Sequence, residues 1–161
     1  MEVIIRQATI FDSSTILNLI QELADYEKEP ESVKLKVSDI ERYGFDKNPM
    51  FKCLVAEIGG KVIGMALYYQ RFSTWRGPTL HLEDLIVTDT YKGRGIGSQL
   101  YTEFIKIADE RGVERIEWNV LDWNSPAIKF YEKSGATILN DWSTVQMHKA
   151  EIKTYLYRLK K

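Results

Sequence analysis

The chain has 161 residues, of which 44% are hydrophobic and 28% charged, and these shares exclude the disordered and fibrous classes of protein. Its length suits one domain, so we expect residues 1–161 to fold as a single domain around one core. The 22 basic and 23 acidic residues give a net charge of -1, which offers no general attraction to nucleic acid.

The first half of the chain contains five segments with the periodicity of regular structure. They are a strand at 3–6, a helix with apolar residues from Ile16 to Leu23, a short helix at 38–43, and strands at 51–58 and 61–69. Gly59 and Gly60 separate the last two segments, and a glycine pair between two strands indicates a tight antiparallel hairpin.

The second half alternates strands with helices. The pattern predicts, in order, a strand at 79–87, a helix that opens in 92–97 and ends near Arg111, a strand at 115–121, a helix at 127–133, a strand at 142–148 and a short helical or irregular tail from 151. Asn124 and Pro126 supply the polar cap and the early proline that are typical of a helix start. Hairpins mixed with crossover helices predict a mixed sheet with helices on both faces, in the α/β or α+β class.

The residue types give little support for a metal site or a membrane-spanning segment. Cys53 is the single cysteine, which excludes an internal disulfide and a cysteine-based zinc site. His81 and His148 lie far apart in the sequence without neighbouring ligand patterns, so we expect no metal. No apolar run approaches the length of a membrane span, and residues 1–7 lack the apolar core of a signal peptide. We therefore expect a cytoplasmic protein without a membrane or nucleic-acid partner.

Three glycines mark the junction between the strand at 79–87 and the helix that follows. Gly93, Gly95 and Gly97 permit close approach to a ligand at a helix start, where several backbone N–H groups have no partner within the helix. The helix dipole favours negative charge there, and Lys92 and Arg94 add positive charge. This combination predicts a phosphate or pyrophosphate site. The spacing differs from both GxGxxG and GxxxxGK[ST], which argues against the two commoner nucleotide motifs.

The segment Lys92-Gly93-Arg94-Gly95-Ile96-Gly97 resembles the [RQ]xxGx[GA] pyrophosphate loop of the GNAT superfamily of N-acetyltransferases, with lysine in place of the usual arginine or glutamine. The resemblance extends from Ile5 to Ala136 and points to the diamine acetyltransferase branch. Segments that carry it include Tyr26-Glu27, Leu82-Glu83-Asp84 and Trp123-Asn124-Ser125-Pro126. Ser73-Thr74-Trp75-Arg76-Gly77 and Leu121-Asp122-Trp123-Asn124 are more similar to the thialysine-acetylating type than to the spermidine/spermine type.

This resemblance implies a mostly antiparallel central sheet whose two central strands splay apart, with acetyl-coenzyme A as the co-substrate and a homodimer as the assembly. Backbone groups of the central strand would pair with the pantetheine arm as if it were an added strand. The residues implied in binding coenzyme A are Leu85, Ile86, Val87, Lys92, Gly93, Arg94, Gly95, Ile96, Gly97, Ser98, Asn124 and Pro126.

Acetyl transfer from a thioester to an amine needs an acceptor for the amine proton and a donor for the leaving thiolate. The resemblance assigns the first role to Glu83, directly or through water, and the second to Tyr131, whose phenol is of a type with an ordinary pKa of ~10. Neighbouring residues of a strand point to opposite faces, so we expect Glu83 and Asp84 to have different roles.

The resemblance places Tyr26, Glu27, Glu83 and Asp84 in the pocket for the acceptor amine, and acidic and aromatic groups suit a cation. Ser73 and Thr74 precede Trp75 where the spermine type carries an acid, which favours a lysine-like amine or a short diamine. Two alternatives stay open: acetylation of a protein or peptide amine, and a homologue that binds coenzyme A without activity.

Overall fold

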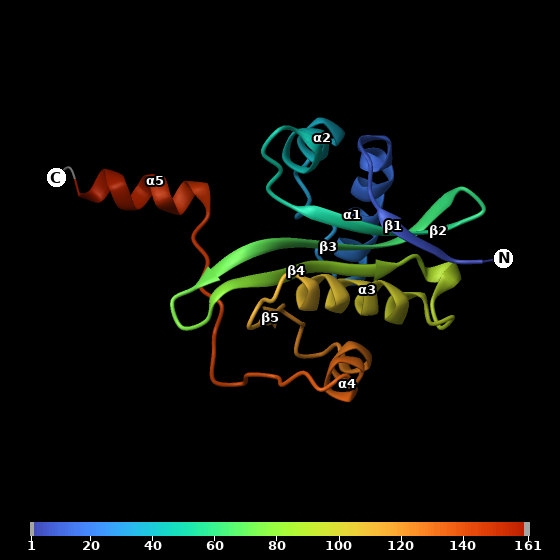
Figure 1. The fold of residues 1–161 in the computed structure, drawn as a ribbon. Coiled ribbons are helices and arrows are strands. Elements are labelled where there is room, and N and C mark those ends of the chain that lie inside the picture. Colours follow the sequence, from blue (N-terminus) through green and yellow to red (C-terminus); the bar gives the residue numbers. More distant parts are fainter. Residues whose placement is uncertain (1, 160–161) are drawn as a thin grey trace. The chain divides into compact units, whose positions relative to one another are not determined.

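The structure, a computed structural model, describes residues 2–159 of the chain (Figure 1). The chain forms two compact units, Met1–Asn119 and Val120–Lys161, and each is described by itself. The first unit holds a five-stranded sheet in the order β1-β2-β3-β4-β5. Its strands are β1 (Ile4–Gln7), β2 (Lys52–Ile58), β3 (Lys61–Ser73), β4 (Gly77–Val87) and β5 (Ile116–Glu117).

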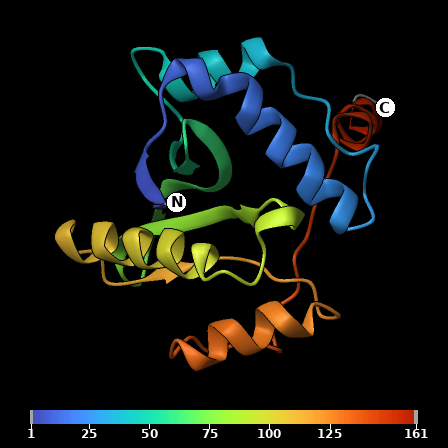
Figure 2. The ribbon, with the colours of Figure 1, turned by 90° about the vertical axis from the view of Figure 1, so that its right-hand side faces the viewer.

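Helices cover both faces of this sheet. Within the first unit they are α1 (Ser13–Tyr26), α2 (Val37–Phe45) and α3 (Ile96–Glu110), with short 3-10 turns η1 (Ile10–Asp12) and η2 (Asp89–Tyr91). Helices α1 and α2 lie over one face and α3 lies under the other (Figures 1 and 2). Ile16, Leu19 and Ile40 of the upper helices pack on one side of the strands, and Phe104 of α3 contacts the ring of Tyr68 on the other. The predicted mixed α/β fold is therefore confirmed.

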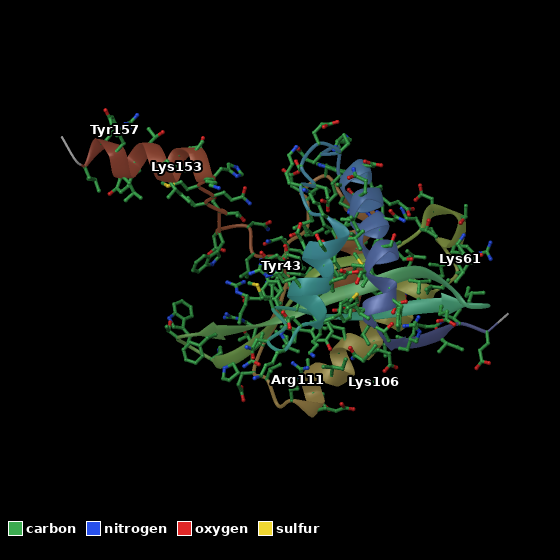
Figure 3. The ribbon with its side chains drawn as sticks, turned by 90° about the horizontal axis from the view of Figure 1, so that it is seen from above. Tyr43, Lys61, Lys106, Arg111, Lys153 and Tyr157 are labelled. Atoms are coloured by element: carbon green, nitrogen blue, oxygen red, sulfur yellow. The ribbon has the colours of Figure 1, made fainter. Side chains whose placement is uncertain are left out.

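The sheet is mostly antiparallel, as expected. Strands β1 to β4 pair antiparallel in chain order, and the turn between β2 and β3 has Gly59 and Gly60 at positive φ angles of 58° and 80°. These angles suit the primed turns that match strand twist, which confirms the predicted hairpin. Lys61 marks the turn in Figure 3.

Strands β4 and β5 share only two residue pairs. They pair parallel at Leu80 with Ile116 and at His81 with Glu117, and β4 then continues to Val87 without a β5 partner among the described residues. This short pairing matches the predicted splay. Strand β5 is shorter than the predicted strand at 115–121, because a strand persists only where a neighbour accepts and donates its hydrogen bonds.

The second unit contains two helices, α4 (Ser125–Lys133) and α5 (Lys149–Arg158). Helix α4 begins as predicted: the Asn124 side chain accepts from the N–H of Ala127 at 3.4 Å, and Pro126 lies in the first turn. Helix α5 confirms the helical option for the tail. The predicted strand at 142–148 is wrong, because this segment has no strand partner in the described part of the chain and Val145 is 92% exposed. The single domain over 1–161 stays a prediction.

A charged cluster fixes the connection from β1 to α1. The guanidinium of Arg6 donates to both carboxylate oxygens of Asp12, at 2.8 and 3.0 Å, and to Glu57 at 2.8 Å. Asp12 also accepts from the backbone N–H of Thr9 at 2.7 Å. Hydrogen bonds from Arg6 hold the pKa of the buried Asp12 carboxyl below its usual range. The cluster therefore stabilises the fold while Asp12 is ionised.

We predict that Asp12→Asn lowers the free energy of unfolding by about 2 kcal/mol at pH 7, because the arginine loses a charged partner in a buried position. A carboxyl whose pKa is lowered in the folded state stabilises the protein fully at pH values above its ordinary pKa of ~3.9. This stabilisation is lost as the pH falls through the pKa of the folded state. Urea unfolding from pH 7 to pH 3 should therefore show the difference shrinking with acidification.

The matched control for this substitution is Asp39→Asn. Asp39 accepts a comparable bond from the N–H of Lys36 at 2.8 Å, but this bond is solvent-exposed and contributes only about 0.5 kcal/mol at the start of α2. Equal losses for the two variants, or a difference that does not change with pH, would contradict the stabilising role of the Arg6 cluster.

Candidate functional site

The glycine loop lies between β4 and α3, as predicted. Gly95 is the N-cap of α3 with a φ of 78°, and Gly93 has a φ of 75°. Both angles are in the left-handed region, which side chains other than glycine rarely adopt. No side chain caps this helix start, so its first N–H groups face outward, while the buried Ile96 anchors the first turn in the core. The local structure is that of an anion site.

Two basic side chains of the glycine loop lie over tyrosine rings. The Lys92 ammonium lies 4.6 Å from the ring centre of Tyr26, the last residue of α1, and also pairs with Asp89. The Arg94 guanidinium lies 5.0 Å from the ring centre of Tyr91. The backbone N–H of Asp89 donates to Glu22 of α1 at 2.9 Å. The loop and the end of α1 are therefore joined by several contacts.

The far end of β4 has one paired edge and one edge without a β5 partner among the described residues. Leu85, Ile86 and Val87 pair with Ala66, Met65 and Gly64 of β3, respectively. A Cβ atom at Gly64 would lie 2.7 Å from the carbonyl oxygen of Ile86, so glycine permits this close pairing. The other edge can pair with an extended ligand, as the resemblance implies for these three residues.

A β-bulge sits at the predicted base. Tyr68 pairs with Leu82 and Leu67 pairs with Asp84, which leaves Glu83 as an extra residue on β4. The expectation that Glu83 and Asp84 point to opposite faces is therefore wrong, because the bulge interrupts the alternation. Asp84 pairs with Leu67, whose side chain is in the core under α1 and α2, and Glu83 bonds to Tyr69 on that same face.

The Glu83 carboxylate is held but accessible. Its Oε2 atom accepts a hydrogen bond from the Tyr69 hydroxyl at 2.7 Å and lies 3.6 Å from Nε2 of His81. The side chain is 50% exposed, so an incoming amine can reach it. Burial and the bond to Glu83 raise the pKa of Tyr69 to about 12, which keeps the phenol protonated as a donor. This geometry suits a proton acceptor with a fixed orientation.

Asp84 and Glu27 extend the acidic character of the site. Burial, together with repulsion by Glu83 and Glu27, raises the pKa of Asp84 to about 7. Burial also raises the pKa of Glu27, which follows the last residue of α1. Glu83 and Glu27 both act electrostatically on Asp84, so a cation bound near these acids would be stabilised. Of the predicted pocket residues, Glu83 and Asp84 are neighbours on β4, and Tyr26 precedes Glu27 at the end of α1.

We predict that Asp84→Asn stabilises the protein at pH 8 by about 1 kcal/mol or more, which corresponds to a rise in Tm of ~3 °C. A carboxyl whose folded pKa is raised costs nothing below the ordinary pKa of ~3.9, and the cost grows as pH rises to about 7. Thermal unfolding at pH 4.5 and pH 8 should show the gain mainly at pH 8. The exposed Asp109→Asn is the control, and an equal gain there would contradict the burial cost.

Three predicted residues belong to the second unit. Asn124 caps α4, and Pro126 follows in its first turn. Tyr131 is buried, with its ring 5.3 Å from that of Phe130, and its carbonyl accepts bonds from Ser134 and Ala136. The cap role of Asn124 is confirmed. The roles of all three toward coenzyme A and the thiolate stay predictions.

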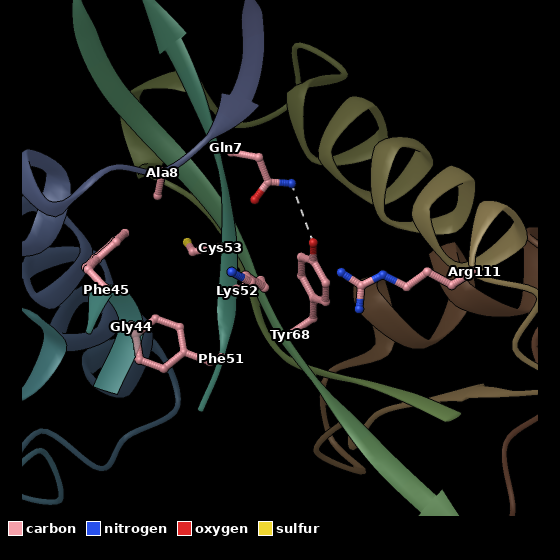
Figure 4. A pocket seen from close by; sticks show the side chains of 9 residues that line it. All are labelled: Gln7, Ala8, Gly44, Phe45, Phe51, Lys52, Cys53, Tyr68 and Arg111. Atoms are coloured by element: carbon pink, nitrogen blue, oxygen red, sulfur yellow. Dashed lines mark hydrogen bonds between the residues drawn. The ribbon is translucent and has the colours of Figure 1, made fainter. Parts of the chain in front are cut away.

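A separate pocket of about 250 Å³ lies in the first unit (Figure 4). Its lining residues are Gln7, Ala8, Gly44, Phe45, Phe51, Lys52, Cys53, Tyr68 and Arg111. None of the predicted site residues is among them. Burial raises the pKa of the Cys53 thiol far above its ordinary value, so this thiol is not a nucleophile.

Sequence reasoning missed the side chains around Glu83, namely Tyr69, Arg71 and His81. His81 is two residues from Glu83 in β4, which is a detectable spacing. The β3 partners depend on the register set by the bulge, and no local pattern reports that register. Within residues 2–159 no three His, Cys, Asp or Glu side chains are placed so that they could hold one metal ion. None of the helices in this range has the length and hydropathy of a membrane span.

Comparison with known proteins agrees with this geometry. Residues 16–136 match the sequence profile of the acetyltransferase (GNAT) family. The chain therefore belongs to the GNAT family and is an N-acetyltransferase.

Three individual proteins are similar to this chain over most of its length. Thialysine N-epsilon-acetyltransferase from Sus scrofa is 40% identical over 147 residues, covering 86% of this chain and 86% of the relative. Spermidine/spermine N(1)-acetyltransferase-like protein 1 from Homo sapiens is 34% identical over 158 residues, covering 92% of this chain and 23% of that protein. An integron cassette protein from V. cholerae has a solved structure with a TM-score of 0.78 at 23% identity, covering 97% of this chain and 98% of that one. The last similarity supports the fold alone.

Proposed function

We propose that this chain transfers the acetyl group of acetyl-coenzyme A to a primary amine of a small cationic molecule, directly and within a ternary complex. The preferred acceptor is thialysine, a lysine-like amine or a short diamine. The observation that carries the proposal is the cluster of Glu27, Glu83 and Asp84 beside the open edge of β4. The identity to thialysine N-epsilon-acetyltransferase supports the same acceptor class.

The residues present fit coenzyme A by their chemistry. Its thioester would supply the activated acetyl group. The uncapped start of α3, with Gly93, Gly95 and Gly97, would bind the pyrophosphate, together with Lys92 and Arg94. The open edge at Leu85, Ile86 and Val87 would pair with the amide groups of the pantetheine arm, and Ile96, Ser98, Asn124 and Pro126 complete the proposed set.

The acidic cluster would act on the acceptor. A primary ammonium is mostly protonated at neutral pH and must lose a proton before it attacks a carbonyl. Glu27 and Asp84 would attract the ammonium, with the ring of Tyr26 at the same end of α1. Glu83 would accept the proton, directly or through one water, because its carboxylate is fixed by Tyr69 and remains half-exposed.

Further parts of the proposal rest on the family resemblance. Tyr131 would donate a proton to the leaving thiolate, and the two units would act as one acetyltransferase domain over 1–161. We also propose a cytoplasmic homodimer without a metal, a membrane or a nucleic acid as partner.

The acceptor class is tested by following thiol release from acetyl-coenzyme A with thialysine, lysine, putrescine, spermidine, spermine and a peptide amine. We expect thialysine or a short diamine to give the highest kcat/KM, because the acidic cluster suits a compact cation. Preference for the peptide would move the acceptor to proteins. Coenzyme A binding without turnover on any amine would favour a binder that lacks activity.

We predict that Gly95→Ala weakens coenzyme A binding about tenfold or more. Alanine at a φ of 78° is strained, so the loop would shift its backbone donors away from the pyrophosphate. Gly60→Ala is a matched control, because Gly60 has a φ of 80° and, like Gly95, leaves free space around an added Cβ. Both variants should lose about 1 kcal/mol of stability. Coenzyme A binding is measured by calorimetry. Equal weakening in the two variants would contradict the assignment of Gly95 to the pyrophosphate site.

A further inference from the structure

His81 is a buried histidine in direct reach of the proposed base. It is 6% exposed and pairs with Tyr69 across β3 and β4, with the two ring centres 5.1 Å apart. Its Nδ1 atom lies 3.1 Å from Nη1 of Arg71, and its Nε2 atom lies 3.6 Å from Oε2 of Glu83. Each ring nitrogen therefore faces a different charged group.

The contact with Arg71 determines where the imidazole proton resides. A guanidinium carries only donors, so the Nδ1 atom that it contacts must be the acceptor. A neutral imidazole has one N–H, which in this case is on Nε2 and points toward Glu83. His81 therefore directs its N–H toward the Glu83 carboxylate, across an electrostatic contact of 3.6 Å that is longer than a hydrogen bond.

Arg71 is itself held in this position. It forms an ion pair with Glu117 of β5, and Glu117 also pairs with Arg115 at 3.0 Å. The His81–Glu117 pair is the last one between β4 and β5, so the network lies where the two strands separate. The same Nη1 atom of Arg71 contacts Nδ1 of His81 and the Glu117 carboxylate, so the ion pair helps to hold the guanidinium beside the ring.

A second proton on His81 is disfavoured in this setting. It would place an N–H on Nδ1 against the donors and the positive charge of Arg71. The charged and titratable groups that face His81 are Tyr69 and Arg71 on β3, Glu83 on β4 and Glu117 on β5. Burial and Arg71 lower the pKa of His81, and the two glutamates oppose them with a smaller net effect. The lowered pKa and the contact with Arg71 both favour the neutral ring of His81.

We propose that His81 is a positioning residue that, held in its Nε2–H form by Arg71, fixes Oε2 of Glu83 together with the Tyr69 hydroxyl. Both contacts of the carboxylate are to Oε2, which leaves Oε1 as the oxygen for the acceptor amine or its bridging water. This inference rests on the proposed function of Glu83, because it explains how a half-exposed carboxylate keeps one orientation.

The proton position is tested without any assay of activity. The chain has two histidines, so imidazole ¹⁵N spectra of the full-length protein contain two sets of signals, and His148→Gln assigns them. We expect the His81 Nε2 signal to be of the protonated type and the Nδ1 signal of the unprotonated type, unchanged between pH 8 and pH 5.5. A proton on Nδ1, or a titration of His81 within this range, would overturn the proposal.

The positioning role is tested by kinetics. His81→Leu should lower kcat about tenfold with less than about a threefold change in acceptor KM, because the base loses its orientation and the acids that attract the amine remain. His81→Gln retains an N–H donor and should recover most of the loss. Arg71→Met should free Nδ1, so that His81 can take a second proton. The resulting positive charge would make the neighbouring Glu83 a weaker base, and a new acid limb should appear in the kcat profile.

The outcomes separate this inference from the proposed function. Suppose that the wild type turns over an amine. If His81→Leu then keeps the full rate, or if Arg71→Met shows no new acid limb, the role of His81 is overturned and the acetyltransferase assignment stays intact. Absence of turnover by the wild type on every amine overturns the proposed function, and this inference with it. Where His81→Leu does not fold, His81→Gln and Arg71→Met decide the question.

Discussion

The site depends on the way in which β4 is paired. One edge of this strand bonds to β3 as far as Val87, whereas the other bonds to β5 only as far as His81. Backbone N–H and C=O groups that face a gap between strands need partners, because an unpaired polar group away from water costs free energy. The separation of β4 from β5 therefore creates the open edge for a ligand, and the bulge that carries Glu83 lies on β4 just past the last pair with β5, at His81.

The bulge has an energetic consequence as well as a geometric one. Because Glu83 is an extra residue, it and Asp84 lie near enough for the charge of one to raise the pKa of the other. Neighbouring like charges raise the free energy of the site without a ligand, and a bound ammonium would relieve that repulsion. The site thus has a physical reason to prefer a cationic ligand, and the bond from Tyr69 keeps Glu83 in one orientation.

The sequence predicts best where the signal is local. The Gly59-Gly60 turn, the glycine loop before α3 and the Asn124 cap each depend on a few adjacent residues, and all three occur as expected. Features that depend on pairing between distant segments were missed. The bulge, the shortness of β5 and the contact of Arg71 with His81 need the register of neighbouring strands, which alternation alone does not supply. The predicted strand at 142–148 failed for the same reason, since a strand-like pattern does not provide a partner.

The chain has a net charge of only -1, but basic and acidic side chains lie in different parts of the proposed site. Lys92 and Arg94 accompany the helix start, and the acids gather beside the bulge. Contacts of Lys92 with Tyr26 and of Asp89 with Glu22 join the glycine loop to α1, and Glu27 directly follows the last residue of that helix. An anionic donor and a cationic acceptor would therefore be drawn to neighbouring but different places, which disfavours either one in the other's position. Because both regions adjoin one helix, a change in its position would alter both, and the two substrates of the proposed direct transfer must be held close together in a fixed orientation.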